Sequence, residues 1–395
     1  MTIPYRPFGR TGVQVSALAL GAMNFGGLGN PSHEDGVRIV HRALDAGINI
    51  VDTADVYSRG ESEVIVGKAL AGRRDDVFLA TKFHGRMGED VNRSGNSRRW
   101  IHRAVEASLE RLGTDHIDLY QVHRPEEDTD FDETLGALTD LVRQGKIRYI
   151  GTSTFPASRI VEGQWTAERR GRERVVAEQP PYSVLARGVE AEVLPVAQRY
   201  GLAVIPWSPL AGGWLTGRYR AGGAQPHSSR ADRQPGRFDL GSAENADKLA
   251  AVEALAVLAD EAGLTLVELA LGFVLAHPAV TAPIIGPRTL AQLEDQLGAA
   301  ATPPAPGRPR RHRQDRPPGH HPLLPRHRLP PTRPPPPPRP LTRHHPARPA
   351  HPLRWAGRAC SHGGAEAGRR RGPPHHRSGL TRGLAADRQT RDLSQ

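Results

Sequence analysis

The chain has 395 residues and a formal net charge of +11, from 53 Lys and Arg against 42 Asp and Glu, and it contains a single cysteine. One cysteine excludes an internal disulfide, so the composition does not imply an oxidising compartment. No stretch approaches the ~20 apolar residues of a membrane span, and the N-terminus lacks the apolar core of a secretion signal. We therefore expect a cytoplasmic protein with no membrane partner.

The positive charge is confined to the C-terminal part of the chain. Residues 302–395 contain 20 Arg, no Lys and four acidic residues, a net charge of 20 − 4 = +16, which leaves 33 basic and 38 acidic residues, a net of −5, in residues 1–301. The first 301 residues are therefore mildly acidic. For this part of the chain we expect no nucleic-acid partner.

The first predicted element is a β-hairpin. Residues 5–20 form two short apolar runs around Gly9-Arg10-Thr11-Gly12, a sequence typical of a tight turn. A first core strand, Ala17 to Leu20, then leads into a glycine-rich loop, Gly21 to Gly29, whose backbone can approach a ligand closely.

Eight apolar or β-branched runs follow one another along the chain, and each ends at a glycine, a polar residue or a tryptophan. The stops are Gly21, Asp52, Lys82, His123, Ser153, Gln179, Trp207 and Gly286, separated by 26 to 41 residues except for the 79 between the last two. Helical periodicity lies between them, for example over residues 37–44 and 100–109. The alternation predicts a (β/α)8 TIM barrel, with the hairpin closing its bottom. A doubly wound sheet is the alternative, but residues 21–26 lack the Gly-x-Gly-x-x-Gly spacing.

Helix ends support the alternation. Asn30 or Ser32 is a suitable N-cap for the first helix, and Gly47 a suitable left-handed C-terminal stop. The same stop recurs at Gly113, Gly145 and Gly201, each just before a strand.

The 79-residue step requires an insertion. Residues 220–240 are rich in Gly, Pro, Ser and Arg and predict a long loop on the active face. Residues 244–276 predict two helices separated at Ala262-Gly263.

Four residues at three strand ends form a candidate catalytic set: Asp52, Tyr57, Lys82 and His123. A free tyrosine hydroxyl has a pKa of about 10, so it needs a neighbouring cation to donate a proton at neutral pH. Lys82 can be that cation, Asp52 can keep it charged, and His123 can orient a carbonyl oxygen. Taken singly, each residue could equally be a cap or a satisfied core residue.

The sequence resembles the aldo/keto reductase superfamily, in the branch of bacterial reductases and potassium-channel β subunits. Seven motifs carry the resemblance, in order: Val51-Asp52-Thr53-Ala54-Asp55-Val56-Tyr57, Ala80-Thr81-Lys82, Gln121-Val122-His123-Arg124-Pro125, Gly151-Thr152-Ser153, Glu178 to Ser183, Trp207 to Gly213, and Ile285 to Thr289. The resemblance covers roughly residues 3 to 300. It implies hydride transfer from NADPH to a small aldehyde or ketone, with Tyr57 as general acid, Lys82 and Asp52 tuning it, and His123 positioning the substrate.

The same resemblance assigns a NADPH site. Ser153 and Gln179 match residues that hold the nicotinamide amide, and Trp207 matches one that stacks on its ring. Ser208, Leu210 and Gly212 match the loop along the pyrophosphate, and Arg288 matches the residue at the adenosine 2′-phosphate, which favours NADP over NAD. The remaining assigned residues are Gly21, Ala22, Met23, Arg218 and Gly286, with Gln292, Asp295 and Gln296 around the adenine.

One departure from the family pattern concerns nicotinamide binding. The family usually has Asn after the serine, whereas this chain has Thr154, whose hydroxyl offers fewer hydrogen bonds. The alternative to an active reductase is a NADP(H)-binding regulatory or redox-sensor subunit with slow turnover. The sequence does not indicate the physiological substrate, the reaction direction or the oligomeric state.

We expect residues 1–301 to form the barrel domain and residues 302–395 to be a disordered tail. The tail holds 21 Pro and 10 His but no Phe, Tyr, Met, Ile, Asn, Lys or Val, so it cannot bury a core. Six of the missing types have AT-rich codons, which favours an off-frame reading of GC-rich coding sequence. A genuine basic tail that binds a polyanion, or an unclassified linker, remains as an alternative.

Overall fold

The structure is a computed structural model and describes residues 3–227 and 229–300. The tail predicted to be disordered, residues 302–395, lies outside the described residues. The strands are β1 (Tyr5–Pro7), β2 (Gln14–Ser16), β3 (Ala19–Gly21), β4 (Ile50–Asp52), β5 (Phe78–Phe83), β6 (Ile117–Val122), β7 (Ile147–Ser153), β8 (Val175–Gln179), β9 (Ala203–Val204) and β10 (Ile284–Ile285). The α-helices are α1 (His33–Asp45), α2 (Glu61–Leu70), α3 (Arg98–Leu112), α4 (Phe131–Arg143), α5 (Ala157–Arg170), α6 (Val193–Tyr200), α7 (Ser229–Arg233), α8 (Pro235–Phe238), α9 (Ala243–Glu261), α10 (Leu266–Leu275) and α11 (Leu290–Ala300).

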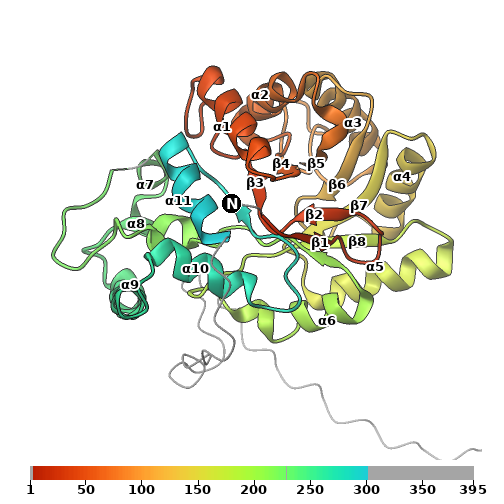
Figure 1. Ribbon diagram of the computed structural model, residues 1–395. Helices are drawn as coiled ribbons and strands as arrows, with labels where there is room; N and C mark the ends of the chain where they lie inside the picture. Colours follow the sequence, from red (N-terminus) through yellow and green to blue (C-terminus); the bar gives the residue numbers. More distant parts are fainter. Residues whose placement is uncertain (1–2, 228, 301–395) are drawn as a thin grey trace, which may run out of the picture. The chain divides into compact units, whose positions relative to one another are not determined.

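A parallel eight-stranded sheet forms the centre, in the order β10-β3-β4-β5-β6-β7-β8-β9. The two outer strands meet through backbone hydrogen bonds, because Thr281 donates to the Val204 carbonyl (2.8 Å) and Ile284 donates to that of Pro206 (2.9 Å). These bonds close the sheet into a cylinder, with the helices outside it (Figure 1). The predicted (β/α)8 barrel is confirmed.

The N-terminal hairpin closes the bottom of the barrel, as predicted. β1 and β2 pair antiparallel, and the hairpin buries Phe8 and Val15 among inward-facing strand residues. The Phe8 ring lies 4.7 Å from that of Phe78, centroid to centroid. Burying a side chain of this size stabilises the fold by about 2 kcal/mol.

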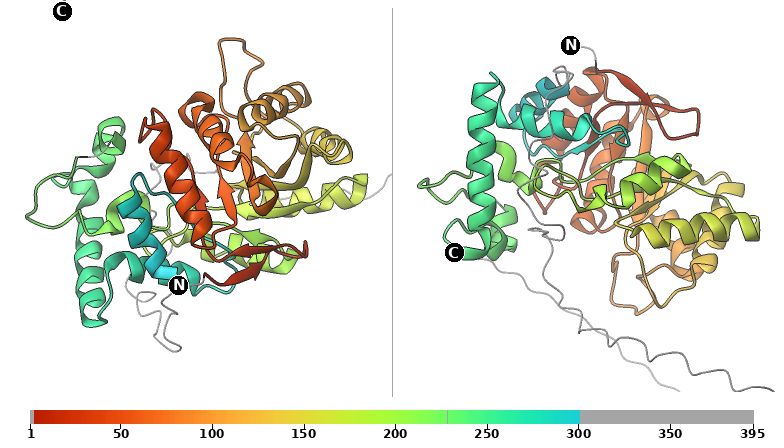
Figure 2. Two further views of the ribbon diagram at one scale, coloured as in Figure 1. Left: turned by 45° about the horizontal axis from the view of Figure 1, so that its top comes forward. Right: turned by 90° about the horizontal axis from the view of Figure 1, so that it is seen from below.

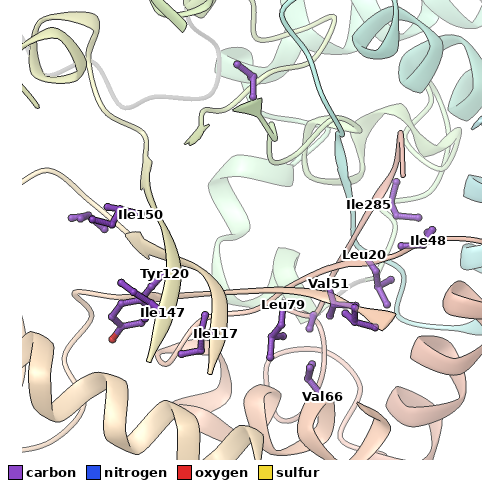
Figure 3. Packing of buried hydrophobic residues seen from close by; sticks show 14 of the residues in the cluster. Leu20, Ile48, Val51, Val66, Leu79, Ile117, Tyr120, Ile147, Ile150 and Ile285 are labelled. Atoms are coloured by element: carbon purple, nitrogen blue, oxygen red, sulfur yellow. The ribbon is translucent and has the colours of Figure 1, made fainter. Parts of the chain in front are cut away.

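The larger part of the core lies between the strands and the surrounding helices. Apolar side chains from successive strands, such as Leu20, Val51, Leu79 and Ile117, point outward into this layer (Figure 3). The helices contribute the apolar stripe that their periodicity predicts, for example Ile101 and Val105 of α3.

The predicted helix boundaries hold closely. The Ser32 side chain caps α1 by accepting from the Asp35 backbone N–H. All four glycines expected at helix ends have positive φ: Gly47, Gly113, Gly145 and Gly201 at 97°, 63°, 73° and 67°.

Several strand boundaries differ from expectation. The first core strand is Ala19–Gly21 rather than Ala17 to Leu20, β5 runs one residue past Lys82, and β6 and β10 stop one residue before His123 and Gly286. The largest difference is at Trp207, since β9 ends at Val204. Beyond Val204 the N–H groups of Ile205 and Trp207 still donate to the carbonyls of Glu178 and Pro180 (3.1 and 3.0 Å). Pro180 has no N–H to donate in return, so the regular ladder with β8 stops.

The insertion is not simply a long loop. Residues 220–240 include the short helices α7 and α8, because Phe238 is buried against the rings of Trp214 and Tyr219 and anchors the segment. The two helices predicted for residues 244–276 are α9 and α10, separated at Ala262-Gly263 as expected. Figures 1 and 2 show α9 at the side of the barrel away from α4 and α5. No helix within the described part of the chain is long and apolar enough to cross a membrane.

Candidate active site

Lys82 lies at the centre of the candidate catalytic set. β4, β5 and β6 are adjacent in the sheet, so their C-terminal ends bring Asp52, Lys82 and His123 to one rim. The Lys82 side chain is completely buried, and its Nζ donates to Asp52 Oδ2 (2.6 Å), to the Thr53 carbonyl (2.7 Å) and to the Tyr57 hydroxyl (3.3 Å).

Electrostatics keep this lysine charged despite its burial. Burial by itself lowers the pKa of Lys82, but the charges of Asp52 and Tyr57 outweigh it and raise the pKa above its ordinary value. The other carboxylate oxygen of Asp52 accepts from the amides of Gln121 (3.1 Å) and Gln179 (2.8 Å). Both members of the buried ion pair therefore have further hydrogen-bond partners, and these bonds offset part of the cost of removing the two charges from water.

Tyr57 begins a short 3-10 helix, η1 (Tyr57–Gly60), in a tight turn. Ser58 and Arg59 have φ values of 48° and 55°, and the Ser58 hydroxyl fixes the turn by donating to the Phe25 carbonyl (2.8 Å). Such left-handed residues cost of order 1–2 kcal/mol, so the surrounding contacts hold the tyrosine in a strained but defined position.

His123 faces Tyr57 edge-on, with 5.8 Å between the ring centroids. Burial, together with the charges of Lys82, Arg124 and His84, holds the pKa of His123 well below its usual range. The ring is therefore neutral at physiological pH. A neutral imidazole and a hydroxyl backed by an ammonium group can both donate to one carbonyl oxygen.

The three residues that the sequence assigned to the nicotinamide, Ser153, Gln179 and Trp207, lie beside this set together with Thr154. The Ser153 hydroxyl donates to the Gln179 carbonyl (3.0 Å), and the indole N–H of Trp207 donates to Thr154 Oγ1 (3.3 Å). The Gln179 amide nitrogen is already engaged with Asp52, which leaves its oxygen for a ligand. Thr154 has φ 62°, a strained value for a β-branched residue, and its hydroxyl orients Trp207.

The loop after Trp207 winds tightly. Ser208, Ala211 and Gly212 have φ values of 57°, 51° and 73°, and the Leu210 carbonyl accepts from the Gly213 N–H (2.9 Å). This backbone leads into η4 (Ala211–Thr216) and places Gly212 and Gly213 beside two arginines. An ideal Cβ on Gly212 would lie 3.4 Å from Arg230, and one on Gly213 would lie 3.5 Å from Arg218.

Three arginines gather near this loop without an acidic partner. Burial and repulsion from Arg237, Arg233 and Arg288 lower the pKa of Arg230, and burial followed by Arg218 lowers that of Arg288. Within the described residues, none of Arg218, Arg230 and Arg288 forms an ion pair. Arg230 and Arg288 are half-buried and Arg218 is exposed. Guanidinium groups that lack a carboxylate partner fit the phosphates of a dinucleotide.

The remaining assigned residues surround the same end of the barrel. Gly21 and Ala22 are buried at the end of β3, Met23 is half-buried, and the following Asn24 donates to the Gly286 carbonyl (2.7 Å). On the last helix, Gln292 accepts from the Arg288 backbone N–H (2.9 Å).

Two residues of α11 have contrasting surroundings. Gln296 is buried, and its Oε1 has no hydrogen-bond partner among the described residues. Asp295 is exposed and lines a hollow of about 500 Å³ between α9, α10 and α11.

Three residues of this region had not been assigned a role from the sequence. Gln121 precedes His123 by two positions, and their shared strand face was a usable signal. Arg124 contacts Ser153 and Thr154, and Arg230 lies in the insertion, where no periodic pattern marks it.

The model of the aldo/keto reductase family matches residues 17–305. The chain belongs to the aldo/keto reductase family. The predicted resemblance is confirmed, and membership supports oxidoreductase activity.

Individual relatives of this aldo/keto reductase cover the same region. This chain is 42% identical over 307 residues to the oxidoreductase YrpG of Bacillus subtilis, and the match covers 75% of this chain and 90% of the relative. It is 35% identical over 308 residues to a probable voltage-gated potassium channel subunit beta of Arabidopsis thaliana, with the same coverage. It is 34% identical over 328 residues to the versiconal hemiacetal acetate reductase of Aspergillus parasiticus, covering 75% and 92%. The relatives thus include a bacterial oxidoreductase and a potassium-channel β subunit, which matches the branch named from the sequence.

Proposed function

We propose that this protein is a NADPH-dependent reductase of aldehydes or ketones, with Tyr57 as general acid. The observation that carries the proposal is the contact of the buried Lys82 ammonium with both Asp52 and the Tyr57 hydroxyl. The cation stabilises the phenolate that remains after Tyr57 gives up its proton. We further propose residues 1–301 as the catalytic domain and the cytoplasm as its location.

The reaction needs one hydride and one proton. NADPH, when bound, supplies the hydride to the carbonyl carbon. Tyr57 donates its proton to the carbonyl oxygen, which gives the alcohol, and the neutral imidazole of His123 holds that oxygen in line. Asp52 accepts hydrogen bonds from Lys82, Gln121 and Gln179, and its carboxylate stabilises the charge on Lys82.

Cofactor selection would fall to the arginines and the stacking tryptophan. Arg288 would meet the 2′-phosphate, with Arg218 and Arg230 near the other phosphates. Trp207 would support the nicotinamide ring, while Ser153 and Gln179 would hold its amide. The absence of carboxylates around these guanidinium groups, within the described residues, supports the assignment.

The test is reduction of a panel of aldehydes and quinones by the purified full chain, followed by absorbance of the reduced cofactor. Tyr57→Phe should remove most of the turnover, a loss of roughly 10²-fold or more, and leave NADPH affinity nearly unchanged. Tyr5→Phe is the matched control, because Tyr5 is half-exposed on the hairpin and bonds only the Gly47 carbonyl. Comparable activity of Tyr57→Phe and wild type would remove Tyr57 from the acid role.

The potassium-channel relatives favour one alternative, a NADP(H)-binding sensor or regulatory subunit. Tight NADPH binding with no turnover on any substrate of the panel would support it over the reductase.

A further inference from the structure

Arg124 lies at the reacting end of the site, and neither the proposed proton transfer nor the proposed cofactor binding assigns it a role. It directly follows His123, and its side chain is half-buried. Its Nη1 donates to the His123 carbonyl (2.6 Å) and to Thr154 Oγ1 (3.2 Å), and lies 3.5 Å from Ser153 Oγ. All of these contacts involve one nitrogen. Nε and Nη2 donate to no residue of the described chain.

No carboxylate within the described residues neutralises this guanidinium. The charge of the buried Glu178 acts to raise the pKa of Arg124, but this carboxylate already accepts from the Thr152 hydroxyl (2.5 Å) and the Phe155 N–H (3.1 Å). Burial raises the pKa of Glu178 to about 7, so near neutrality it carries only part of a charge. A half-buried cation without a counter-charge is costly and indicates an anionic ligand.

The phosphates of the cofactor cannot supply that charge. The arginines suited to phosphates lie beside Gly212, Gly213 and one another, whereas Arg124 contacts His123 and Ser153. The contact of the guanidinium with the His123 carbonyl places it next to the residue proposed to hold the reacting oxygen. An anion at this position therefore belongs to the substrate.

We propose that Arg124 is a specificity residue that selects carbonyl substrates carrying a carboxylate. Nε and Nη2 form the side-on fork that matches the two carboxylate oxygens, while Nη1 anchors the group to the barrel rim. This inference rests on the proposed reductase function, since it concerns the substrate of the same site.

The test compares acids with uncharged analogues of the same shape. The three positional isomers of carboxybenzaldehyde and their methyl esters vary the reach between aldehyde and carboxylate. The full-length wild type should show a higher kcat/KM for at least one acid than for its ester. Arg124→Met should lower kcat/KM for that acid by roughly 10- to 100-fold and change the ester by less than about threefold. Arg124→Lys, which keeps the charge but loses the fork, should fall between the two.

Two controls separate recognition from structure. Arg230→Met should weaken NADPH binding and reduce turnover of acid and ester alike. If Arg124→Met also reduces both equally, Arg124 only holds His123 and Thr154 in place, and the inference is wrong. A wild type that prefers no acid over its ester would contradict it as well.

A binding measurement distinguishes this inference from the proposed function. Benzoate titrated calorimetrically into protein saturated with NADP⁺ should bind to wild type and lose roughly 10-fold or more in affinity with Arg124→Met. If no aldehyde is reduced, the proposed function fails, yet this titration still decides the role of Arg124. Equal benzoate binding by both proteins would overturn the inference whatever the turnover.

Discussion

At the scale of single residues, the candidate catalytic set and the candidate phosphate site differ in whether their cations have a carboxylate partner. Lys82 is buried and forms an ion pair with Asp52. Arg288 is half-buried and forms no ion pair with any carboxylate of the described residues. The first arrangement is complete without a ligand. The second acquires a counter-charge only when an anion binds, so the two groups should respond differently to substitution.

Arg288→Ala should weaken NADP(H) binding far more than NAD(H) binding, by roughly 10- to 100-fold, because only NADP(H) carries the 2′-phosphate. Fluorescence titration of both reduced cofactors measures the difference. Arg42→Ala serves as control, since Arg42 is a surface residue paired with Glu294. Equal losses for the two cofactors would show that Arg288 does not meet the 2′-phosphate.

Asp55 should make stability depend on pH. It is buried, and neither carboxyl oxygen has a hydrogen bond of normal geometry with the described residues. Burial, followed by repulsion from Glu63, raises its pKa to about 8, against a partial offset from the Val56 N–H. Between about pH 4 and about pH 8 the folded chain keeps a proton that the unfolded chain loses, so the free energy of unfolding falls as pH rises.

Asp55→Asn cannot ionise and escapes this loss. Urea unfolding should give nearly equal stabilities at or below about pH 4 and a variant increasingly more stable than wild type from there toward about pH 8. Asp115→Asn, at a fully exposed position beside His116, should show no such trend. A gap between Asp55→Asn and wild type that is constant with pH would mean that Asp55 does not titrate in this range.

At the scale of elements, the helix starts follow local sequence closely and can be tested singly. Thr265 and Glu268 form a complete capping box at the start of α10, in which the Glu268 N–H donates to the Thr265 hydroxyl (3.1 Å) and the Thr265 N–H donates to the Glu268 carboxylate (2.7 Å). Ser242 occupies the equivalent position of α9, but its side chain makes no cap hydrogen bond.

Thr265→Ala should therefore lower the free energy of unfolding by about 1 kcal/mol, and Ser242→Ala by clearly less. Urea unfolding of the two variants gives the comparison. Equal losses would indicate that the hydroxyl is not what stabilises the start of α10.

The elements that local sequence missed are those held by distant contacts. β9 is only two residues long because Pro180 of the neighbouring chain segment has no N–H to donate to it. α8 forms where Phe238 packs against Trp214 and Tyr219. Composition alone makes residues 220–240 resemble a loop. The aromatic cluster that orders them depends on side chains up to about 20 residues away and on α9 and α10.

At the scale of the whole molecule, the remaining prediction concerns residues 302–395. Their composition, with 20 Arg and 21 Pro and no Phe, Ile or Val, cannot supply a core. Deleting them should leave the melting temperature and the NADPH affinity of the chain unchanged. Calorimetric melting and cofactor titration of the full chain and of residues 1–301 provide the measurement. If the truncated chain lost cofactor binding or cooperative unfolding that the full chain retains, the tail would be a working part of the protein.

The sequence by itself determined the barrel, the hairpin and the strand ends at which the candidate catalytic residues lie. It could do so because strand and helix periodicities and glycine stops are local properties, and because a parallel barrel brings every strand end to one rim. That topology brings Asp52, Lys82 and His123 to one rim, with Tyr57 five residues after Asp52. The chemistry of these residue types then makes them a candidate set.

Only the tertiary structure decided how these residues are connected. The amides of Gln121 and Gln179 meet on one oxygen of Asp52, although 69 and 127 residues separate them from it along the chain. Arg230 lies beside Gly212, and one nitrogen of Arg124 is anchored while the other two have no partner in the described chain. Side-chain direction and charge compensation depend on packing between distant elements, and no local pattern records them.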